Sequence, residues 1–577
     1  MQIIVLIFIF LTHIVFADSG NQISDKDIDS LQSSIDYSIQ KLETLKAKRR
    51  LRDQKHDSPL MDNQKFAGLN NIPLAIHQAF GQKDYTRYPS NPYQSRLKVN
   101  TEDKSLDMEF HAWLQADQDI FYNTEGIYMF DGTTSDPVLN QNNVSRYWLR
   151  RARPSIEGKA FGFFNYFFNI DFGLNNPRLY DAFIDINYYR LLGLQVGQQM
   201  SLVSGIENYI DNFDYVSRAF TMEVSPSAML APDRQYGMVL HGSFGPSGSE
   251  PFYPGLTMLG FDDMFSYQLG WLTDTPDNQT KDGLYNFLNE NSVAENNFVD
   301  YTFEGRVFVN PFIDKHGSWL QHLGIGFSGS IGSPNKQGNQ PSLSSVGLNP
   351  IFIYGANNLD DNSYGADSIF VNGRRSRLHP QMVWGYGPLG FLADWTETTQ
   401  NLAYFLPQGE LLDYFTQRNQ ANQLTVVYNL TQEDFNLFHF IPNRPFKLLN
   451  RDGMGGLQMV FRLSGLQLDP NIFNKSYSVE DDENNIYTYY YYADPRISVQ
   501  KAHTWSIGLN WYWDRFIRWT TEYDFTSFVG GCSTLAGSNN CLGGAAGDPF
   551  SNMYLNSNQV MNRPAEKIFM TRVQVQF

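Results

Sequence analysis

The chain has 577 residues and a formal net charge of −17, and 15% of its residues are aromatic although its mean hydropathy is −0.38. A chain that is polar on average yet this rich in Phe and Tyr needs a fold that presents its two faces to different solvents. A transmembrane β-barrel does so, because an apolar band with aromatic girdles encloses a polar interior. A secreted β-solenoid or β-sandwich would not need so many aromatic side chains.

The first 17 residues contain no Asp, Glu, Lys or Arg and include an apolar run from Ile3 to Phe16. This run is shorter than the roughly 20 residues that a helix needs to cross a bilayer, which disfavours a single anchoring helix. Small residues at its end suit a signal peptidase, although the basic residue usual at the start is missing. We therefore predict a signal peptide over residues 1–17, cleaved before Asp18, and export to the envelope of a Gram-negative bacterium.

Residues 18–51 form the next predicted element, a helix with apolar residues at heptad spacing. Its a and d positions are Ile28, Leu31, Ile35, Ser38, Leu42 and Leu45. Acidic residues near its start and basic residues at its end suit the helix dipole. The pattern predicts a short periplasmic coiled-coil helix that serves as an oligomerisation stalk, with an amphipathic helix packed against the barrel as the alternative. Residues 52–104, rich in Asp, Asn, Pro and Gln, are predicted to be a linker.

Alternating apolar and polar residues dominate residues 105–577, the predicted barrel domain. In the last strand Phe569, Thr571, Val573, Val575 and Phe577 share one face, and Met570, Arg572, Gln574 and Gln576 share the other. A period of two is typical of a strand with lipid on one face and water on the other. We predict an all-β fold, a transmembrane antiparallel β-barrel of about 16 strands. The terminal Phe577 resembles the signal that outer-membrane barrels present to their assembly machinery.

Long polar loops alternate with tight turns along this domain. The loops include 274–297, 333–372 and 529–562, and one tight turn is predicted at Asp514 and Arg515. Outer-membrane barrels carry long loops outside the cell and short turns in the periplasm, so the pattern predicts a sidedness. Cys532 and Cys541 enclose a loop of Gly, Ser and Asn, and in an oxidising compartment they are predicted to form a structural disulfide.

Motifs for catalysis are missing from the sequence, which contains no HExxH, no Walker loop and no GxSxG. Gly324, Gly326 and Gly329 match a dinucleotide-binding fingerprint. They lie in an alternating segment with no helix after it, so we predict that they line a barrel wall. The chain is therefore not predicted to be an enzyme, and no cofactor and no metal site is predicted.

Two clusters of basic residues stand out in this acidic chain. They are Arg150, Arg151 and Arg153, and Arg374, Arg375 and Arg377. Arg151 shares a strand face with Arg153, and Arg375 shares one with Arg377. Guanidinium groups on a lumen wall would attract phosphate or carboxylate oxygens. The alternatives are that these arginines pair with lumen acids and brace the wall, or that they contact lipid headgroups.

Several blocks of the sequence, in order, resemble the phosphate-selective porin O and P family. The blocks are 150–158, 177–184 with 194–198, 222–237, 377–391, and the chain end with 510–512 and Phe577. The resemblance implies a 16-stranded barrel, a homotrimer, and a constriction loop at about 200–233 that is folded into the lumen. It also implies that lumen arginines lead phosphate to the constriction, and Arg151 and Arg153 match those arginines.

The predicted constriction loop departs from the family because it contains no lysine. Where a family member often has Lys-Pro-Phe, this chain has Gln199, Met200 and Ser201. The pore-lining candidates for anion binding are Arg151, Arg153, Arg218, Arg234, Arg375 and Arg377. The acidic candidates of the constriction loop are Glu207, Asp211 and Asp214.

These observations predict an outer-membrane porin for the passive diffusion of small hydrophilic solutes or ions. Two ion preferences stay open, one for anions such as phosphate through the arginine clusters, and a weak one for cations through the acidic constriction loop. Its expected surroundings are a homotrimer, outer-membrane lipid and lipopolysaccharide, with no nucleic acid. The alternative is a barrel-anchored surface protein whose long extracellular loops mediate interaction or adhesion, and a plugged lumen without conductance would distinguish it. An outer-membrane enzyme such as a lipase would need a Ser/His/acid cluster, which the sequence does not locate.

Overall fold

The computed structural model describes parts of the compact unit Ala75–Phe577. The described residues are 98–101, 105–122, 128–129, 138–139, 145–173, 177–205, 226–247, 263–273, 300–334, 343–352, 354, 369–405, 411–437, 440–447, 453–480, 486–496, 498–533 and 560–576. The predicted signal peptide, the coiled-coil helix and nearly all of the linker lie outside these residues and stay predictions.

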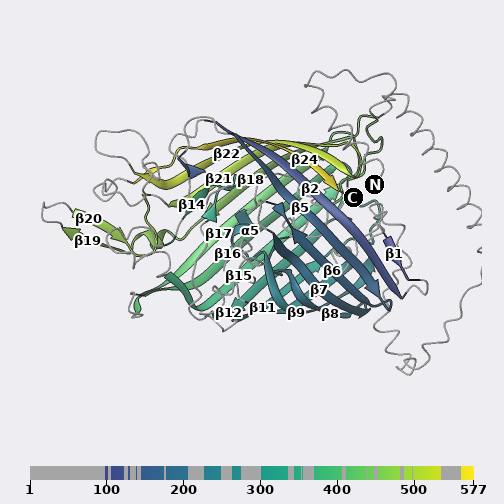
Figure 1. The fold of residues 1–577 in the computed structure, drawn as a ribbon, viewed down its shortest axis with the longest axis horizontal. Helices are drawn as coiled ribbons and strands as arrows, with labels where there is room; N and C mark the ends of the chain where they lie inside the picture. Colours follow the sequence, from purple (N-terminus) through teal and green to yellow (C-terminus); the bar gives the residue numbers. More distant parts are fainter. Residues whose placement is uncertain are drawn as a thin grey trace, which may run out of the picture. The chain divides into compact units, whose positions relative to one another are not determined.

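The main sheet of the described residues contains 18 antiparallel strands. Sixteen of them form a ring, the wall of a barrel, and the short β1 and β23 lie outside this ring. In chain order the wall strands are β2 (Leu106–Tyr122), β5 (Ser145–Ala160), β6 (Phe164–Asp171), β7 (Arg178–Tyr189), β8 (Leu192–Met200), β9 (Arg234–Ser247), β10 (Asp263–Thr273), β11 (Tyr301–Val309), β12 (Gly324–Gly332), β15 (Ile369–Tyr386), β16 (Leu389–Phe405), β17 (Leu411–Asn429), β18 (Gly456–Gln467), β21 (Val499–Tyr512), β22 (Ile517–Ser533) and β24 (Glu566–Gln576). Each pairs with the next, and β24 pairs with β2, so the ring is closed (Figure 1). The prediction of an all-β closed barrel of about 16 strands is confirmed.

The remaining described elements are short. β1 (Lys98–Asn100) pairs with β2 and β23 (Val560–Asn562) with β22. Three two-stranded ladders join β3 (Tyr128–Met129) to β4 (Val138–Leu139), β13 (Leu343–Ser344) to β14 (Pro350–Phe352), and β19 (Ser476–Glu480) to β20 (Ile486–Tyr490). The helices are α5 (Pro226–Met229) and the 3₁₀ helix η6 (Pro470–Phe473). None of the described helices is long and apolar enough to cross a bilayer.

Side chains of the wall strands alternate between a buried inner face and an exposed outer face. On β24, Arg572 and Gln574 are buried whereas Val573 is exposed. On β21, Ile507 and Leu509 are exposed on the outer face. A period of two in the sequence predicts these faces for both strands, and both are confirmed. This also fixes their register, since a slip of one residue would exchange the two faces.

The predicted alternation fails at Tyr180. Tyr180 and Ile184 are four residues apart in an alternating segment, so a period of two predicts that they share the apolar face, but Tyr180 is buried and Ile184 is exposed. The register between β6 and β7 shifts between Asn169 and Ile170, opposite Tyr180. A bulge of this kind re-aims a side chain, and the Tyr180 ring therefore points into the barrel.

The outer face carries an apolar band. Exposed members include Val196, Leu240, Leu269, Val307, Ile325, Met382, Leu424, Leu463, Ile507 and Val573. Aromatic pairs lie near both ends of this band. Ring centroids of Trp511 and Trp519 are 6.2 Å apart near one end, and those of Trp271 and Tyr301 are 6.0 Å apart near the other. Two aromatic levels around an aliphatic band are typical of a barrel that sits in a bilayer.

The two ends of the barrel differ in their connections. At one end, here the short-turn end, the tight turns 161–163, 190–191, 387–388 and 513–516 join strands, and β2 begins and β24 ends. The longer connections 248–262, 310–323 and 430–455 lie at this end too. At the opposite end, the long-loop end, the connections include 201–233, 274–300, 333–368 and 468–498. A carboxylate oxygen of Asp514 accepts hydrogen bonds from the backbone N–H of Phe516 (2.8 Å) and Ile517 (2.9 Å). This closes the tight turn that the sequence predicts at Asp514 and Arg515.

Substitution of Ile507 by Arg is expected to lower the free energy of unfolding, because the charge would lie on the outer face near the middle of β21. The expected loss is about 2–4 kcal/mol, and it is measured by denaturant unfolding in lipid vesicles. The matched control is Ser527→Arg, which lies on the outer face of the neighbouring strand β22, nearer the end of the barrel. For this variant the expected loss of unfolding free energy is about 0–1 kcal/mol. Equal losses for both variants would contradict an outer band that is embedded in lipid.

Candidate functional site in the barrel interior

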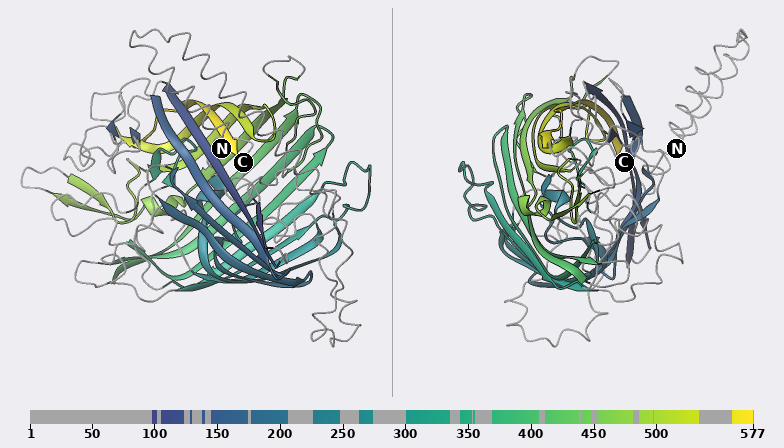
Figure 2. Two further views of the ribbon diagram at one scale, coloured as in Figure 1. Left: turned by 45° about the vertical axis from the view of Figure 1, so that its right-hand side comes forward. Right: turned by 90° about the vertical axis from the view of Figure 1, so that its left-hand side faces the viewer.

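Two segments between wall strands fold back onto the inner face of the barrel. The first inner segment consists of residues 201–205 and 226–233 and includes α5; the second consists of 343–352 with residue 354 and includes β13 and β14. Their described side chains are almost all buried. Figure 2 shows α5 within the ring of strands. A 16-stranded ring is too wide for wall side chains alone to fill, so these segments contribute to burying the inner face.

The first inner segment is held by polar side chains of β11, β15 and β16. A carboxylate oxygen of Glu304 accepts a hydrogen bond from the N–H of Leu202 at 2.9 Å. The Thr398 hydroxyl donates to the carbonyl oxygen of Leu230 at 2.7 Å. Nδ1 of His379 lies 2.8 Å from a carbonyl oxygen of the same segment. The ends of the predicted constriction loop are therefore fixed on the inner wall.

The second inner segment is held by a different part of the wall. The Arg146 guanidinium donates to the carbonyl oxygen of Gly347 at 2.9 Å, and the Asn349 amide donates to the carboxylate of Glu566. The Tyr354 hydroxyl donates to a glutamine of β17 at 2.8 Å. Contacts therefore run from this segment to β5, β24 and β17.

Both inner segments cross the interior. The first connects β8 to β9, yet α5 packs against β16, β17 and β18. The second connects β12 to β15, yet it reaches β5 and β24, which lie about half the ring away. Each segment thus ties together wall strands that do not pair with one another.

The second inner segment corrects the prediction that the loop 333–372 is external. Leu343, Val346, Ile351 and Phe352 are buried inside the barrel. These apolar residues interrupt a stretch rich in Ser, Gly and Asn, and packing them against the inner wall removes them from water. The last residues of that predicted loop belong to β15.

An apolar cluster lies where the inner segments meet the wall. It includes Met229, Leu230, Leu343, Ile351, Phe352, Tyr404, Leu466, Ala502 and Phe528. The cavity beside it, lined by residues of α5, β13, β18, β21 and β22, has a volume of about 10 Å³. Such a volume holds about one water molecule.

Guanidinium and aromatic groups alternate along the inner face of β2, β5, β7 and β9. This arginine–aromatic row consists, in spatial order, of Arg151, Trp113, Arg153, Tyr180 and Arg234, all buried. The guanidinium carbons of Arg151 and Arg153 lie 5.1 and 4.8 Å from the Trp113 ring centroid. Those of Arg153 and Arg234 lie 3.8 and 4.8 Å from the Tyr180 ring centroid. Contacts at these distances are cation–π interactions, which gain strength when water is excluded.

Two arginines of this row also have carboxylate partners. Nε of Arg153 donates to Asp171 at 2.8 Å. Arg234 donates to both carboxylate oxygens of Asp181, at 2.7 and 3.2 Å. Arg151 instead donates to the side-chain oxygen of a β2 glutamine at 3.2 Å. The paired carboxylates offset the charges of Arg153 and Arg234, which favours the bracing interpretation for these two residues.

A second basic group, the arginine cluster, consists of Arg306 on β11 with Arg375 and Arg377 on β15. All three are buried on the inner face. β12 lies between β11 and β15 and pairs with both. Across β12, Arg377 is level with Glu304, and Arg306 is level with His379. On the inner faces of β11, β12 and β15, the described charged side chains are these three arginines and Glu304, when His379 is neutral. A β16 aspartate lies 3.8 Å from His379.

The structure places five of the six predicted pore-lining arginines on the inner face, as the alternation predicts: Arg151, Arg153, Arg234, Arg375 and Arg377. Their role in anion binding stays a proposal. Outside the described residues lie Arg218, Glu207, Asp211, Asp214, Cys541 and Phe577. Cys532 is buried at the end of β22 and is not a free cysteine, but its bond to Cys541 stays a prediction.

Sequence reasoning missed Arg306, Glu304, Trp113 and Tyr180. Arg306 and Glu304 share the polar face of a segment whose other face holds large apolar residues, so the alternation of that segment was a signal for both. Trp113 lies on the inner face of β2 among polar residues, where an aromatic ring is not expected. Nothing in the sequence marks the bulge that turns Tyr180 inward.

Asp171→Asn is expected to lower the free energy of unfolding by about 3–5 kcal/mol, because the buried Arg153 loses its charged partner. The double variant Arg153→Met with Asp171→Asn is expected to recover most of that loss, since no uncompensated charge remains. Denaturant unfolding measures both. The control is Asp314→Asn, whose pair with Lys315 is exposed and for which we expect a loss below about 1 kcal/mol. A loss for Asp171→Asn as small as that of the control would contradict the brace.

No protein-family model matches the chain, and no curated protein matches it. Among solved structures, it is similar to the outer membrane channel DcaP of Acinetobacter baumannii, with a TM-score of 0.44 and 9% identity, covering 83% of this chain and 99% of that one. It is also similar to an anion-selective porin from Comamonas acidovorans, with a TM-score of 0.40 and 7% identity, covering 82% of this chain and 100% of that one. A third similar structure is OmpF of Salmonella typhi in complex with daunomycin, with a TM-score of 0.38 and 11% identity, covering 83% of this chain and 100% of that one. Values this low support no argument about function, and the resemblance to the phosphate-selective porin O and P family stays a prediction.

Proposed function

We propose that the chain is a porin of a Gram-negative outer membrane, a water-filled channel for the passive diffusion of small hydrophilic solutes or ions. The observation that carries this proposal is a closed ring of strands with an apolar outer band and a charged inner face. Lipid requires that every backbone polar group be paired within the protein, which a closed ring achieves. A charged interior suits a barrel that admits water and ions.

We further propose a preference for anions such as phosphate, located at the arginine cluster. Three guanidinium groups lie there with one carboxylate, Glu304, on the inner faces of the same three strands. Fixed positive charges in a confined lumen raise the local concentration of anions, and guanidinium donors match phosphate oxygens. The arginine–aromatic row contributes less to this preference because carboxylates offset Arg153 and Arg234.

The proposal includes the assembly that the sequence predicts. The barrel would be a homotrimer in outer-membrane lipid and lipopolysaccharide, inserted by the barrel assembly machinery, which would read Phe577. Its short-turn end would face the periplasm, with the N-terminal helix on that side. This orientation is supported by the position of both ends of the wall at the short-turn end, since outer-membrane barrels have short periplasmic turns.

A second candidate function is a barrel-anchored surface protein whose long extracellular loops mediate interaction or adhesion. The packing of α5 and β13 against the wall favours it, because a cavity between them and the wall has a volume of about 10 Å³. In this case conductance would be absent and the lumen contacts would serve stability alone. Conductance of the purified protein distinguishes the two functions.

In a planar bilayer under a KCl gradient, the reversal potential of the wild type is expected to lie toward the chloride potential. Arg375→Ala with Arg377→Ala should move it toward zero, because two fixed positive charges leave the lumen. The matched control is Arg418→Ala, an exposed arginine paired with Glu397 at 2.6 Å, which should leave the potential unchanged. A cation-selective wild type would contradict the anion preference alone, whereas a non-conducting wild type would contradict the porin proposal.

Replacing residues 343–352 by a short Gly/Ser linker is expected to increase the single-channel conductance, because the second inner segment crosses the lumen. The increase should be measurable in the same bilayer. An equal replacement within the external hairpin of β19 and β20 serves as the control, since it removes a ladder that is not paired with the barrel wall. An unchanged conductance would show that the second inner segment does not limit passage.

A further inference from the structure

We infer that Glu109, His111 and Glu157 form a binding site for a divalent transition-metal ion, with Zn²⁺ as the best match. The three residues lie on the inner face of β2 and β5, close to the short-turn end. No residue of the site belongs to the arginine–aromatic row or to the arginine cluster, although Trp113 of the row follows His111 on the same face of β2. Neither the fold nor the porin proposal depends on the site.

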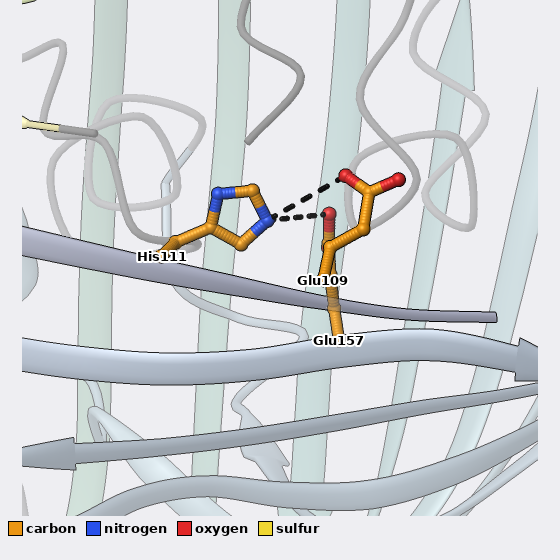
Figure 3. A group of neighbouring side chains, drawn as sticks. All are labelled: Glu109, His111 and Glu157. Atoms are coloured by element: carbon orange, nitrogen blue, oxygen red, sulfur yellow. Dashed lines mark ion pairs between the residues drawn. The ribbon is translucent and has the colours of Figure 1, made fainter. Parts of the chain in front are cut away.

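The register of two strands brings the ligand atoms together. Glu109 and His111 are two residues apart on β2 and so share a face, and Glu109 pairs directly with Glu157 of β5. Nε2 of His111 lies 3.2 Å from Oε1 of Glu157 and 3.9 Å from Oε2 of Glu109. Figure 3 shows the imidazole ring and both carboxylates pointing toward one another. One ligand atom from each residue lies within 4.8 Å of the other two.

These separations fit a shared ion. Ligand atoms that bind a tetrahedral Zn²⁺ at 2.0–2.2 Å lie about 3.3–3.6 Å from one another. The two distances from Nε2 of His111, 3.2 and 3.9 Å, fall on either side of that range, and the two carboxylate oxygens lie within 4.8 Å of each other. Imidazole nitrogen and carboxylate oxygen are both common zinc ligands, and three protein ligands leave a fourth position for water or a solute.

Burial and charge also favour a cation between these groups. The side chains of His111, Glu157 and Glu109 are 0%, 5% and 13% exposed. Two carboxylates held this close away from bulk water repel each other. A divalent ion placed between them compensates both charges. The ladder between β2 and β5 is regular from Leu106 to Gln115, which holds the ligands in a fixed frame.

A second buried histidine shows what a simple brace needs. Nε2 of His241 lies 2.6 Å from one carboxylate oxygen of Asp185, in a hydrogen-bonded pair of one imidazole and one carboxylate. Such a pair is complete with a single acid. The His111 cluster adds a second carboxylate within reach of the same ring, which a brace does not use and a metal site does.

Calorimetric titration of the full-length protein in detergent with Zn²⁺, after treatment with a chelator, tests the site. We expect one Zn²⁺ per chain for the wild type. His111→Ala and Glu157→Gln should weaken binding by at least about 100-fold, since loss of a group that only orients a ligand already costs 10–100-fold. His241→Ala, the matched control, should bind as the wild type does.

Two outcomes would overturn the inference: a wild type that binds no Zn²⁺, and a His111→Ala variant that binds as tightly as the wild type. If His111→Ala fails to fold, as judged by its heat-modifiable migration on gels, Glu109→Gln replaces it because that side chain is partly exposed and the substitution keeps its shape. The reversal potential of the wild type is independent of this result. Loss of the metal proposal would therefore leave the porin proposal standing, and the reverse also holds.

Discussion

The pairing of the last wall strand with the first is the contact on which the rest of the barrel depends. β24 pairs with β2 from Lys567 and Tyr122 to Gln576 and Trp113, and with β22 on its other side. Without this seam the sheet would have two long edges, and their N–H and C=O groups would face lipid, where nothing can pair with them. Inner side chains reinforce the seam, since Arg572 donates to both carboxylate oxygens of Asp117, at 2.7 and 2.6 Å. The closed ring is thus held by backbone and side-chain contacts that join opposite ends of the sequence.

A ring closed from 16 strands has a wide interior, and in this chain charged groups line it. Burying these charges is the second requirement that the fold must meet. Charges removed from water cost several kcal/mol each unless they are paired with good geometry. The inner face meets this requirement with pairs such as Arg153 with Asp171, and with aromatic rings between neighbouring guanidinium groups. The inner segments supply further partners from their backbone, as when Gly347 accepts from Arg146. The interior is therefore a polar network that also ties distant wall strands together, and the same contacts that stabilise it narrow the lumen.

Much of the wall was predictable because strand alternation is a local signal. The faces of β24 and β21, and the inward position of Arg151, Arg153, Arg375 and Arg377, follow from a period of two along each strand. Contacts between distant segments were not predictable, since a sequence shows no pairing partners. The second inner segment was therefore expected outside, although its apolar residues 343, 346, 351 and 352 indicated burial. Tyr180 was assigned to the wrong face because a bulge breaks the period without any residue that marks it. The cluster of Glu109, His111 and Glu157 needed the register between β2 and β5, which no single strand contains.

The location of the charges decides which group controls ion passage. A net charge of −17 acts weakly on a confined solute, because the potential in a low-dielectric lumen is governed by the nearest fixed charges. The resemblance to a phosphate-selective family points to Arg151 and Arg153, yet a carboxylate lies against Arg153 and a glutamine against Arg151. The arginine cluster combines three guanidinium groups with Glu304 on three neighbouring strands, and Asp394 of β16 lies beside it, 3.8 Å from His379. A selectivity filter requires an excess of one charge where the passage is narrow, and the first inner segment contacts Glu304 and His379 at this part of the wall. The anion preference that we propose is therefore located on the inner wall of β11 to β15 and not on the early arginine-rich strand.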